Sequence, residues 1–257
     1  MTNTTDVQVL RRDGAPSLAW QRRAPQPGRA KLLWLGGFRA DMGGTKATFL
    51  DGWAAETGRG LTRFDYSGHG RSEGTFEDGT IGQWTHDALA VLDTCTEGPQ
   101  ILVASSMGAW IACHLAQARP ERIAGLLLLA AAPDFTEDLM WESFPFHVRE
   151  AIENEGRWVQ TGPEGETVIT RALIEDGRAQ RVLGAPLPYE GPVRLLHGLA
   201  DTDVPWTQAS RLIDAFTSRD IEMTLIKGAN HRLSDPASLA RVTALLEALC
   251  GRAETTS

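Results

Sequence analysis

The sequence predicts an α/β protein with a doubly wound, mostly parallel sheet and a helical lid insertion. Two observations indicate this class. Short apolar runs alternate with amphipathic segments along most of the 257 residues, as strands and helices do in a parallel sheet. From Pro133 to Gly191 the alternation stops, and Trp, Phe, Pro and acidic residues replace it. We therefore expect a core formed by residues 1–132 and 192–257, and a lid formed by residues 133–191.

The expected elements follow in order. An Asp13-Gly14 turn leads into a strand over Leu18–Arg22, and Gly36-Gly37 ends a buried strand that begins at Lys31. Apolar runs predict further strands over residues 61–64, 100–104, 123–132, 193–196 and 221–226. Helical spacing predicts helices over residues 45–57, 81–95 and 107–118, near 207–216 and from about 236 to 249. Ligands of such sheets bind at the carboxyl ends of the strands.

Composition excludes several classes of protein. The charges sum to 25 − 33 = −8, whereas a nucleic-acid partner calls for clustered Lys and Arg. The longest small or apolar run, Ile123–Ala132, is far shorter than the ~20 residues of a membrane-spanning helix. The first ten residues lack a secretory pattern. Three cysteines without metal-ligand spacing suit a reducing compartment, so we expect a cytoplasmic protein. The reaction expected from the motifs below needs no metal or organic cofactor.

A candidate nucleophile lies between a predicted strand and a predicted helix, in Ala104-Ser105-Ser106-Met107-Gly108. Small residues two positions before and after a serine allow the sharp turn of a nucleophile elbow, so Ser106 is the candidate. The pattern usually begins with Gly, and Ala104 occupies that position. The alternative is that Ser105 or Ser106 only caps the helix.

A serine nucleophile needs a base that a third group orients, and the expected order is Ser, acid, His. Asp201 follows one predicted strand and is favoured as the acid, with Asp203 in the same loop as its rival. His231 follows the next strand and is favoured as the base. His69 also lies in a loop after a strand, but it precedes the nucleophile in the chain.

Acyl transfer also requires donors for the oxyanion, each worth about 3–4 kcal/mol when removed singly. One candidate is the N–H of Met107, directly after the nucleophile. The other is the N–H of Phe38, because Gly36-Gly37 lets the backbone approach the reacting centre. The competing interpretation of this segment is a plain Gly-Gly turn.

Taken together, these motifs resemble the α/β-hydrolase superfamily, and within it the palmitoyl-protein thioesterases and acyl-glucuronide esterases with their bacterial relatives. The resemblance rests on Phe64-Asp65-Tyr66-Ser67-Gly68, residues 98–103, Ser105 to Trp110, Ala118-Arg119-Pro120-Glu121, Arg194 to Gly198, Asp201, Val204-Pro205-Trp206 and His231-Arg232. It assigns Ser106, Asp201 and His231 as a catalytic triad. The chain departs from the family at Ala104 and Ala109, where Gly is usual. It also carries Gly36-Gly37-Phe38 in place of His-Gly-Phe, which removes an imidazole beside the oxyanion loop.

The resemblance implies a serine hydrolase that cleaves esters or thioesters through an acyl-enzyme on Ser106. We expect a small-molecule or acylated substrate. Arg39 is a candidate for pairing with an anionic substrate group; aromatic residues could line an acyl pocket, namely Trp141, Phe144, Phe146, Trp158 and Trp206. The alternatives are an acyltransferase or C–C hydrolase on the same triad, or a binding protein without catalysis, since fold alone does not determine function.

Overall fold

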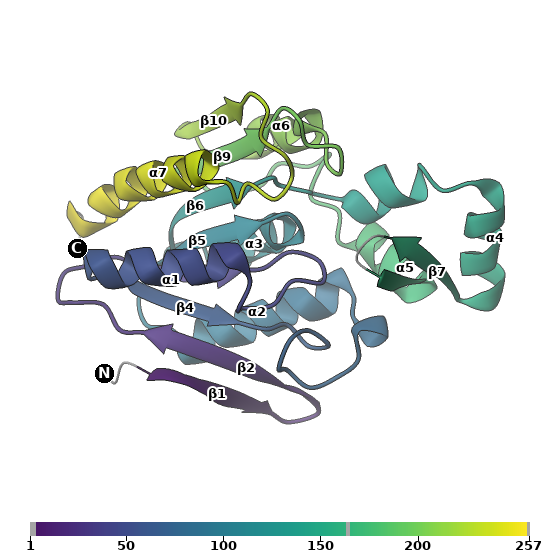
Figure 1. The fold of residues 1–257 in the computed structure, drawn as a ribbon, viewed down its shortest axis with the longest axis horizontal. Helices are drawn as coiled ribbons and strands as arrows, with labels where there is room; N and C mark the ends of the chain where they lie inside the picture. Colours follow the sequence, from purple (N-terminus) through teal and green to yellow (C-terminus); the bar gives the residue numbers. More distant parts are fainter. Residues whose placement is uncertain (1–3, 163–164, 256–257) are drawn as a thin grey trace.

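The computed structural model describes residues 4–162 and 165–255 and is drawn in Figure 1. Its strands are β1 Thr4–Arg12, β2 Ala15–Arg23, β3 Lys31–Leu35, β4 Gly60–Phe64, β5 Gln100–Ser105, β6 Ile123–Leu129, β7 Arg157–Gly162, β8 Gly165–Thr170, β9 Val193–Gly198 and β10 Ile221–Ile226. Its α-helices are α1 Thr45–Thr57, α2 Ile81–Cys95, α3 Met107–Ala118, α4 Phe146–Glu155, α5 Arg171–Ala179, α6 Trp206–Ala215 and α7 Pro236–Thr255. Short helical turns are η1 Phe76–Asp78, η2 Pro120–Arg122 and η3 Thr136–Trp141.

Eight strands form one mixed sheet in the order β1-β2-β4-β3-β5-β6-β9-β10. The strands from β4 to β10 in this order pair in parallel, whereas β2 is antiparallel to both β1 and β4. The Asp13-Gly14 turn joins β1 to β2, with Gly14 at a φ of 72°. The doubly wound, mostly parallel sheet expected from the sequence is confirmed, and the carboxyl ends of β3, β5, β9 and β10 meet at one edge.

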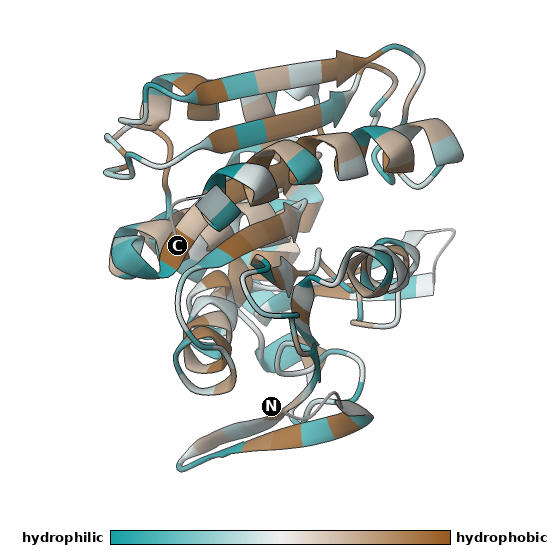
Figure 2. Ribbon diagram, turned by 90° about the vertical axis from the view of Figure 1, so that its left-hand side faces the viewer, coloured by the Kyte–Doolittle hydropathy of each residue, from teal (hydrophilic) through white to brown (hydrophobic). Residues whose placement is uncertain are grey.

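Helices cover both faces of the sheet. Along β3, Leu33 and Leu35 point into a cluster with α2, α3 and α6, while Leu32 and Trp34 point into a second cluster with α1 and α7. This alternation explains why the central strands are almost continuously apolar: both faces are buried. In Figure 2 the outermost strand, β1, instead carries alternating polar and apolar bands, as expected for a strand at a sheet edge. None of the helices in the described part of the chain has the length and apolarity that crossing a membrane requires.

The segment between β6 and β9 stands beside the sheet in Figure 1 and contains η3, α4, β7, β8 and α5. It is less helical than expected, because β7 and β8 pair antiparallel as a separate two-stranded sheet. Val148, Ile152, Ile169 and Ile174 form a small core of its own. Asp134 ties the two ends of the segment together by accepting the N–H groups of Val182 and Leu183.

Strand β6 is shorter than expected. It ends at Leu129 rather than Ala132, because Ala130 turns to a φ of 45° and donates its N–H to the carbonyl of Leu196. The last helix is longer than expected and continues to Thr255. Both differences lie at element ends, where periodicity carries least information.

Candidate active site

Ser106 occupies a strained turn between β5 and α3. Its φ of 54° and ψ of −117° are unusual for a residue with a side chain, and such strain is often concentrated at functional sites. Gly108 makes the turn possible, since a Cβ there would lie 2.3 Å from the carbonyl oxygen of Leu35. Ala104 is fully buried, so the methyl group that replaces the usual Gly is accommodated in the core.

The loops after β9 and β10 bring two further side chains to Ser106. Nε2 of His231 lies 3.1 Å from Oγ of Ser106, and Nδ1 of His231 lies 2.8 Å from Oδ2 of Asp201. Gly198 ends β9 and allows the two loops to touch, because a Cβ there would lie 2.1 Å from the carbonyl oxygen of Ala229. The three residues predicted as nucleophile, acid and base are therefore joined by hydrogen bonds.

The carboxylate of Asp201 is buried and hydrogen-bonded at both oxygens. Oδ1 accepts the N–H groups of Asp203 and Val204, and Oδ2 accepts from His231 and from His197, whose Nε2 is 3.1 Å away. Burial alone would raise the pKa of Asp201, but the hydrogen bonds from His197, His231 and Val204 outweigh it and hold the pKa well below its usual range. Asp201 is thus an anion at neutral pH.

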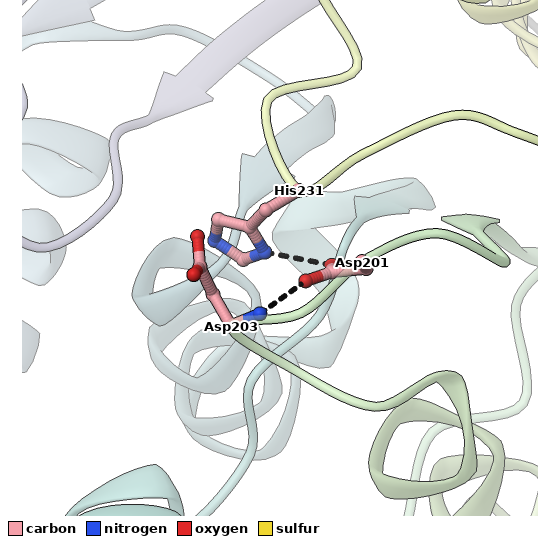
Figure 3. A group of neighbouring side chains, drawn as sticks. All are labelled: Asp201, Asp203 and His231. Carbon is pink, nitrogen blue, oxygen red and sulfur yellow. Dashed lines mark hydrogen bonds and ion pairs between the residues drawn. The ribbon is translucent and has the colours of Figure 1, made fainter.

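Asp203, the rival acid, is exposed and lies beside the opposite edge of the His231 ring (Figure 3). Asp201, Asp203 and His231 offer ligand atoms within 4.8 Å of one another, a spacing that suits a metal ion. However, the nitrogens of His231 are hydrogen-bonded to Asp201 and Ser106, and a metal would have to displace those bonds. The donor set therefore fits proton transfer better than metal binding.

The two predicted oxyanion donors flank Ser106. Gly37 packs so closely that a Cβ there would lie 3.4 Å from Cβ of Ser106, which brings the segment before Phe38 against the turn at Ser106. Met107 is the first residue of α3, where a backbone N–H has no partner within its helix. Among the described residues, neither the N–H of Phe38 nor that of Met107 donates to a backbone or side-chain acceptor.

Both ring nitrogens of His69, the rival base, are hydrogen-bonded to backbone groups, and neither is bonded to Ser106. Its Nε2 accepts the backbone N–H of Arg39, and its Nδ1 pairs with the carbonyl oxygen of Ser67. His197, at the end of β9, contacts the carboxylate of Asp201 directly. Its position at the end of a strand, four residues before Asp201, is the sequence signal for this contact.

The predicted substrate-binding residues are spread over the segment between β6 and β9, the loop after β3 and the start of α6. Arg39 is exposed, and its guanidinium bonds Oγ1 of Thr167 on β8. Trp141 and Phe144 are half-buried and pack within the segment between β6 and β9; Trp141 lies under Arg149 and Arg178, and Phe144 meets Trp158 edge to face. Two others are more exposed, Phe146 at 79% and Trp206, the first residue of α6, at 39%.

Comparison with known proteins identifies the family to which the chain belongs. The family model described as "Serine aminopeptidase, S33" (Hydrolase_4) matches residues 27–164. The rat protein named "Palmitoyl-protein thioesterase ABHD10, mitochondrial" is 34% identical over 98% of this chain and 84% of its own length. A crystal structure of a putative hydrolase from Agrobacterium vitis is 40% identical, with a TM-score of 0.90, over 95% of this chain and 98% of that one.

The structure of mouse alpha/beta hydrolase domain-containing protein 10 is 33% identical, with a TM-score of 0.87, and again covers 95% of this chain and 98% of that one. These relatives extend the match beyond residue 164 to the loops that carry Asp201 and His231. The chain belongs to the α/β-hydrolase superfamily, within the Hydrolase_4 family, and is a hydrolase of the ester or thioester kind.

Proposed function

We propose that the protein hydrolyses carboxylic esters or thioesters through an acyl-enzyme on Ser106. The hydrogen-bonded chain from Ser106 through His231 to Asp201 is the observation that carries the proposal. A serine hydroxyl is a weak nucleophile at neutral pH unless a base removes its proton as it attacks. His231 is that base, and the anionic Asp201 holds its ring and stabilises the imidazolium that forms.

In the first half of the reaction, Oγ of Ser106 bonds to the substrate carbonyl carbon while its proton passes to Nε2 of His231. The N–H groups of Phe38 and Met107 hold the oxyanion. The tetrahedral intermediate then expels the alcohol or thiol, which takes the proton from His231. Water repeats the sequence on the acyl-enzyme and releases the acid, with His231 again accepting and returning a proton.

The substrate we favour carries a long acyl chain, as in a palmitoyl thioester. The rat relative named as a palmitoyl-protein thioesterase supports this choice. Phe38 supports it further, because its ring packs against both the sheet core and the small core of the insertion, so apolar side chains surround the loop that carries the proposed oxyanion donor. Arg39, next in the chain, supplies a cation for an anionic substrate group.

The test combines a covalent probe with a substrate panel. A fluorophosphonate probe labels the wild type, and p-nitrophenyl ester turnover falls by about 10⁴-fold or more in Ser106→Ala. Ser105→Ala, at the buried neighbouring serine, is the matched control and keeps both activities. Absence of labelling in the native wild type would favour a binding protein on this scaffold. The relative turnover of acyl thioesters, simple esters and acyl glucuronides then ranks these substrate classes.

We also place the protein in the cytoplasm. Cys95, Cys113 and Cys250 are free and buried, and burial raises the pKa of Cys95 and of Cys250 to about 12. Such thiols suit a reducing compartment. Fractionation of the native cells tests the location, and recovery with a membrane or organelle fraction would overturn it.

A further inference from the structure

The loop that carries Phe38 is held by side chains from β4 and the loop that follows it. Arg63 donates to the carbonyl oxygen of Met42, and the buried carboxylate of Asp65 accepts the N–H of the same residue at 2.6 Å. Nearer to Phe38, the N–H of Arg39 donates to Nε2 of His69 over 3.2 Å. His69 is therefore the side chain that anchors the peptide immediately after the proposed oxyanion donor.

The partners of His69 determine its tautomer. The N–H of Arg39 can only donate, so Nε2 must be unprotonated. The carbonyl of Ser67 can only accept, so Nδ1, 3.2 Å away, must carry the proton. Burial lowers the pKa of His69, although the Ser67 carbonyl and Asp87 oppose the shift. The ring is consequently neutral and keeps its acceptor at neutral pH.

His69 is only 4% exposed, and its ring lies in an aromatic cluster with Tyr66, Phe76 and Trp84. Phe38 packs edge to face on Phe76 and Trp84, with ring centroids 4.9 and 5.9 Å apart. The cluster therefore supports the side chain of Phe38, while Nε2 of His69 holds the next peptide. Arg39 adopts a φ of 61°, an unfavourable value for a residue with a side chain, so its backbone needs such support.

We propose that His69 is a positioning residue for the oxyanion loop: it anchors the Phe38–Arg39 peptide and so aims the N–H of Phe38 at the reacting carbonyl. The chain has Gly36 where the family usually has a histidine, and His69 supplies an imidazole to the same loop from the neighbouring strand. The inference rests on the proposed function, because it concerns an oxyanion that forms only in acyl transfer.

Two amide substitutions separate the acceptor from the rest of the ring. The amide of His69→Gln reaches the position of Nε2 and can accept from Arg39. The shorter amide of His69→Asn reaches only the position of Nδ1 and keeps the bond to Ser67. We expect kcat in the Asn variant to fall roughly 10- to 100-fold, less than the 10²–10³-fold loss from deleting an oxyanion donor. KM should change little, and the Gln variant should recover most of kcat.

A second measurement uses an inhibitor that forms a tetrahedral adduct with serine, such as a trifluoromethyl ketone. Loss of packing around His69 alone would not change the affinity of this inhibitor. Its affinity should weaken in the Asn variant by the same factor as kcat/KM and recover in the Gln variant. Equal losses in the two variants, or an unchanged adduct affinity, would overturn the role of His69. An inactive wild type would instead overturn the proposed function.

Hydrogen–deuterium exchange gives a measure that does not need activity. The peptide spanning residues 36–44 should exchange faster in the Asn variant than in the Gln variant and the wild type, because the Arg39 amide loses its acceptor. Identical exchange in all three proteins would show that His69 does not hold the loop. Matching thermal midpoints would confirm that both variants fold.

Discussion

His197 and Asp201 form a buried pair in which Nε2 of the imidazole lies 3.1 Å from Oδ2 of the carboxylate. The same oxygen accepts the Nδ1–H of His231, so two imidazoles hold one carboxylate. Nε2 of His197 also lies 2.9 Å from the carbonyl oxygen of Val204, which fixes the proton of His197 on that nitrogen. His197 thus links the end of β9 to both Asp201 and Val204 in the loop that follows.

Loss of the His197 donor should slow catalysis without abolishing it. A hydrogen bond to a charged group is worth about 1.5–3 kcal/mol, so His197→Phe should loosen Asp201 and lower kcat roughly 10-fold. His197→Gln keeps an N–H donor near the position of Nε2 and should stay within about 3-fold of the wild type. Steady-state ester hydrolysis measures both, and a larger loss in Gln than in Phe would contradict the assignment.

Substitution of the two aspartates in the loop after β9 should lower kcat to very different extents. Asp201→Asn keeps the shape of the side chain but cannot orient and charge-stabilise His231, so we expect kcat to fall by about 10⁴-fold. Asp203 is exposed, and an exposed charge contributes little, so Asp203→Asn should change kcat by less than about 3-fold. Comparable losses in the two variants would mean that the acid has been assigned to the wrong residue.

In the turn around Ser106, we expect substitution to be tolerated at Ala104 but not at Gly108. The Cβ of Gly108→Ala would lie 2.3 Å from the Leu35 carbonyl oxygen, so the free energy of unfolding should fall by about 1–3 kcal/mol or more, along with kcat. Ala104→Gly restores the residue usual in the family and should cost only about 0.5–1 kcal/mol, with kcat retained. Denaturant unfolding and ester hydrolysis test this pair, and similar stabilities would contradict the packing argument.

The lowered pKa of Lys46 predicts that the stability of the fold depends on pH above neutrality. Its amine donates to the carbonyl oxygen of Arg232, beside His231, and burial together with the charge of Arg232 lowers its pKa to about 8. Between about pH 8 and the ordinary value of 10.5 the unfolded chain holds the proton and the folded chain does not, so this residue's contribution to stability rises with pH. The Tm difference between wild type and Lys46→Gln should therefore shift in favour of the wild type from pH 7.5 to 10. A constant difference would refute the lowered pKa.

Arg39 has two candidate roles, binding an anionic substrate and holding the predicted lid, residues 133–191, through Thr167. Arg39→Ala should raise KM for an ester with a carboxylate by roughly 10-fold, and much less for a neutral ester, because only the first loses a charged partner. Thr167→Val removes the lid contact but keeps the cation, and should leave both KM values within about 2-fold of wild type. If Thr167→Val reproduces the Arg39→Ala pattern, the lid contact is the role of Arg39.

The central strands and helices were predictable because their apolar residues repeat with the period of the element. Helix α1 at Thr45–Thr57 and strand β10 at Ile221–Ile226 have the expected bounds. The β7–β8 hairpin was missed because most of β7 is exposed, so its sequence carries no burial pattern. The site residues were predictable as a set, because parallel strands deliver their following loops to one edge of the sheet.

Periodicity and motif order were enough to predict the fold class, the sharp turn at Ser106 and the chain order of the proposed nucleophile, acid and base. The choice between Asp201 and Asp203 as the proposed acid depends on tertiary contacts, because the two residues share one loop and one residue type. In the structure both His197 and His231 contact the carboxylate of Asp201. Likewise, only the structure gave His69 its partner, 30 residues away on a neighbouring loop. Local periodicity specifies elements, whereas such contacts depend on the order of strands in the sheet, which brings distant loops together.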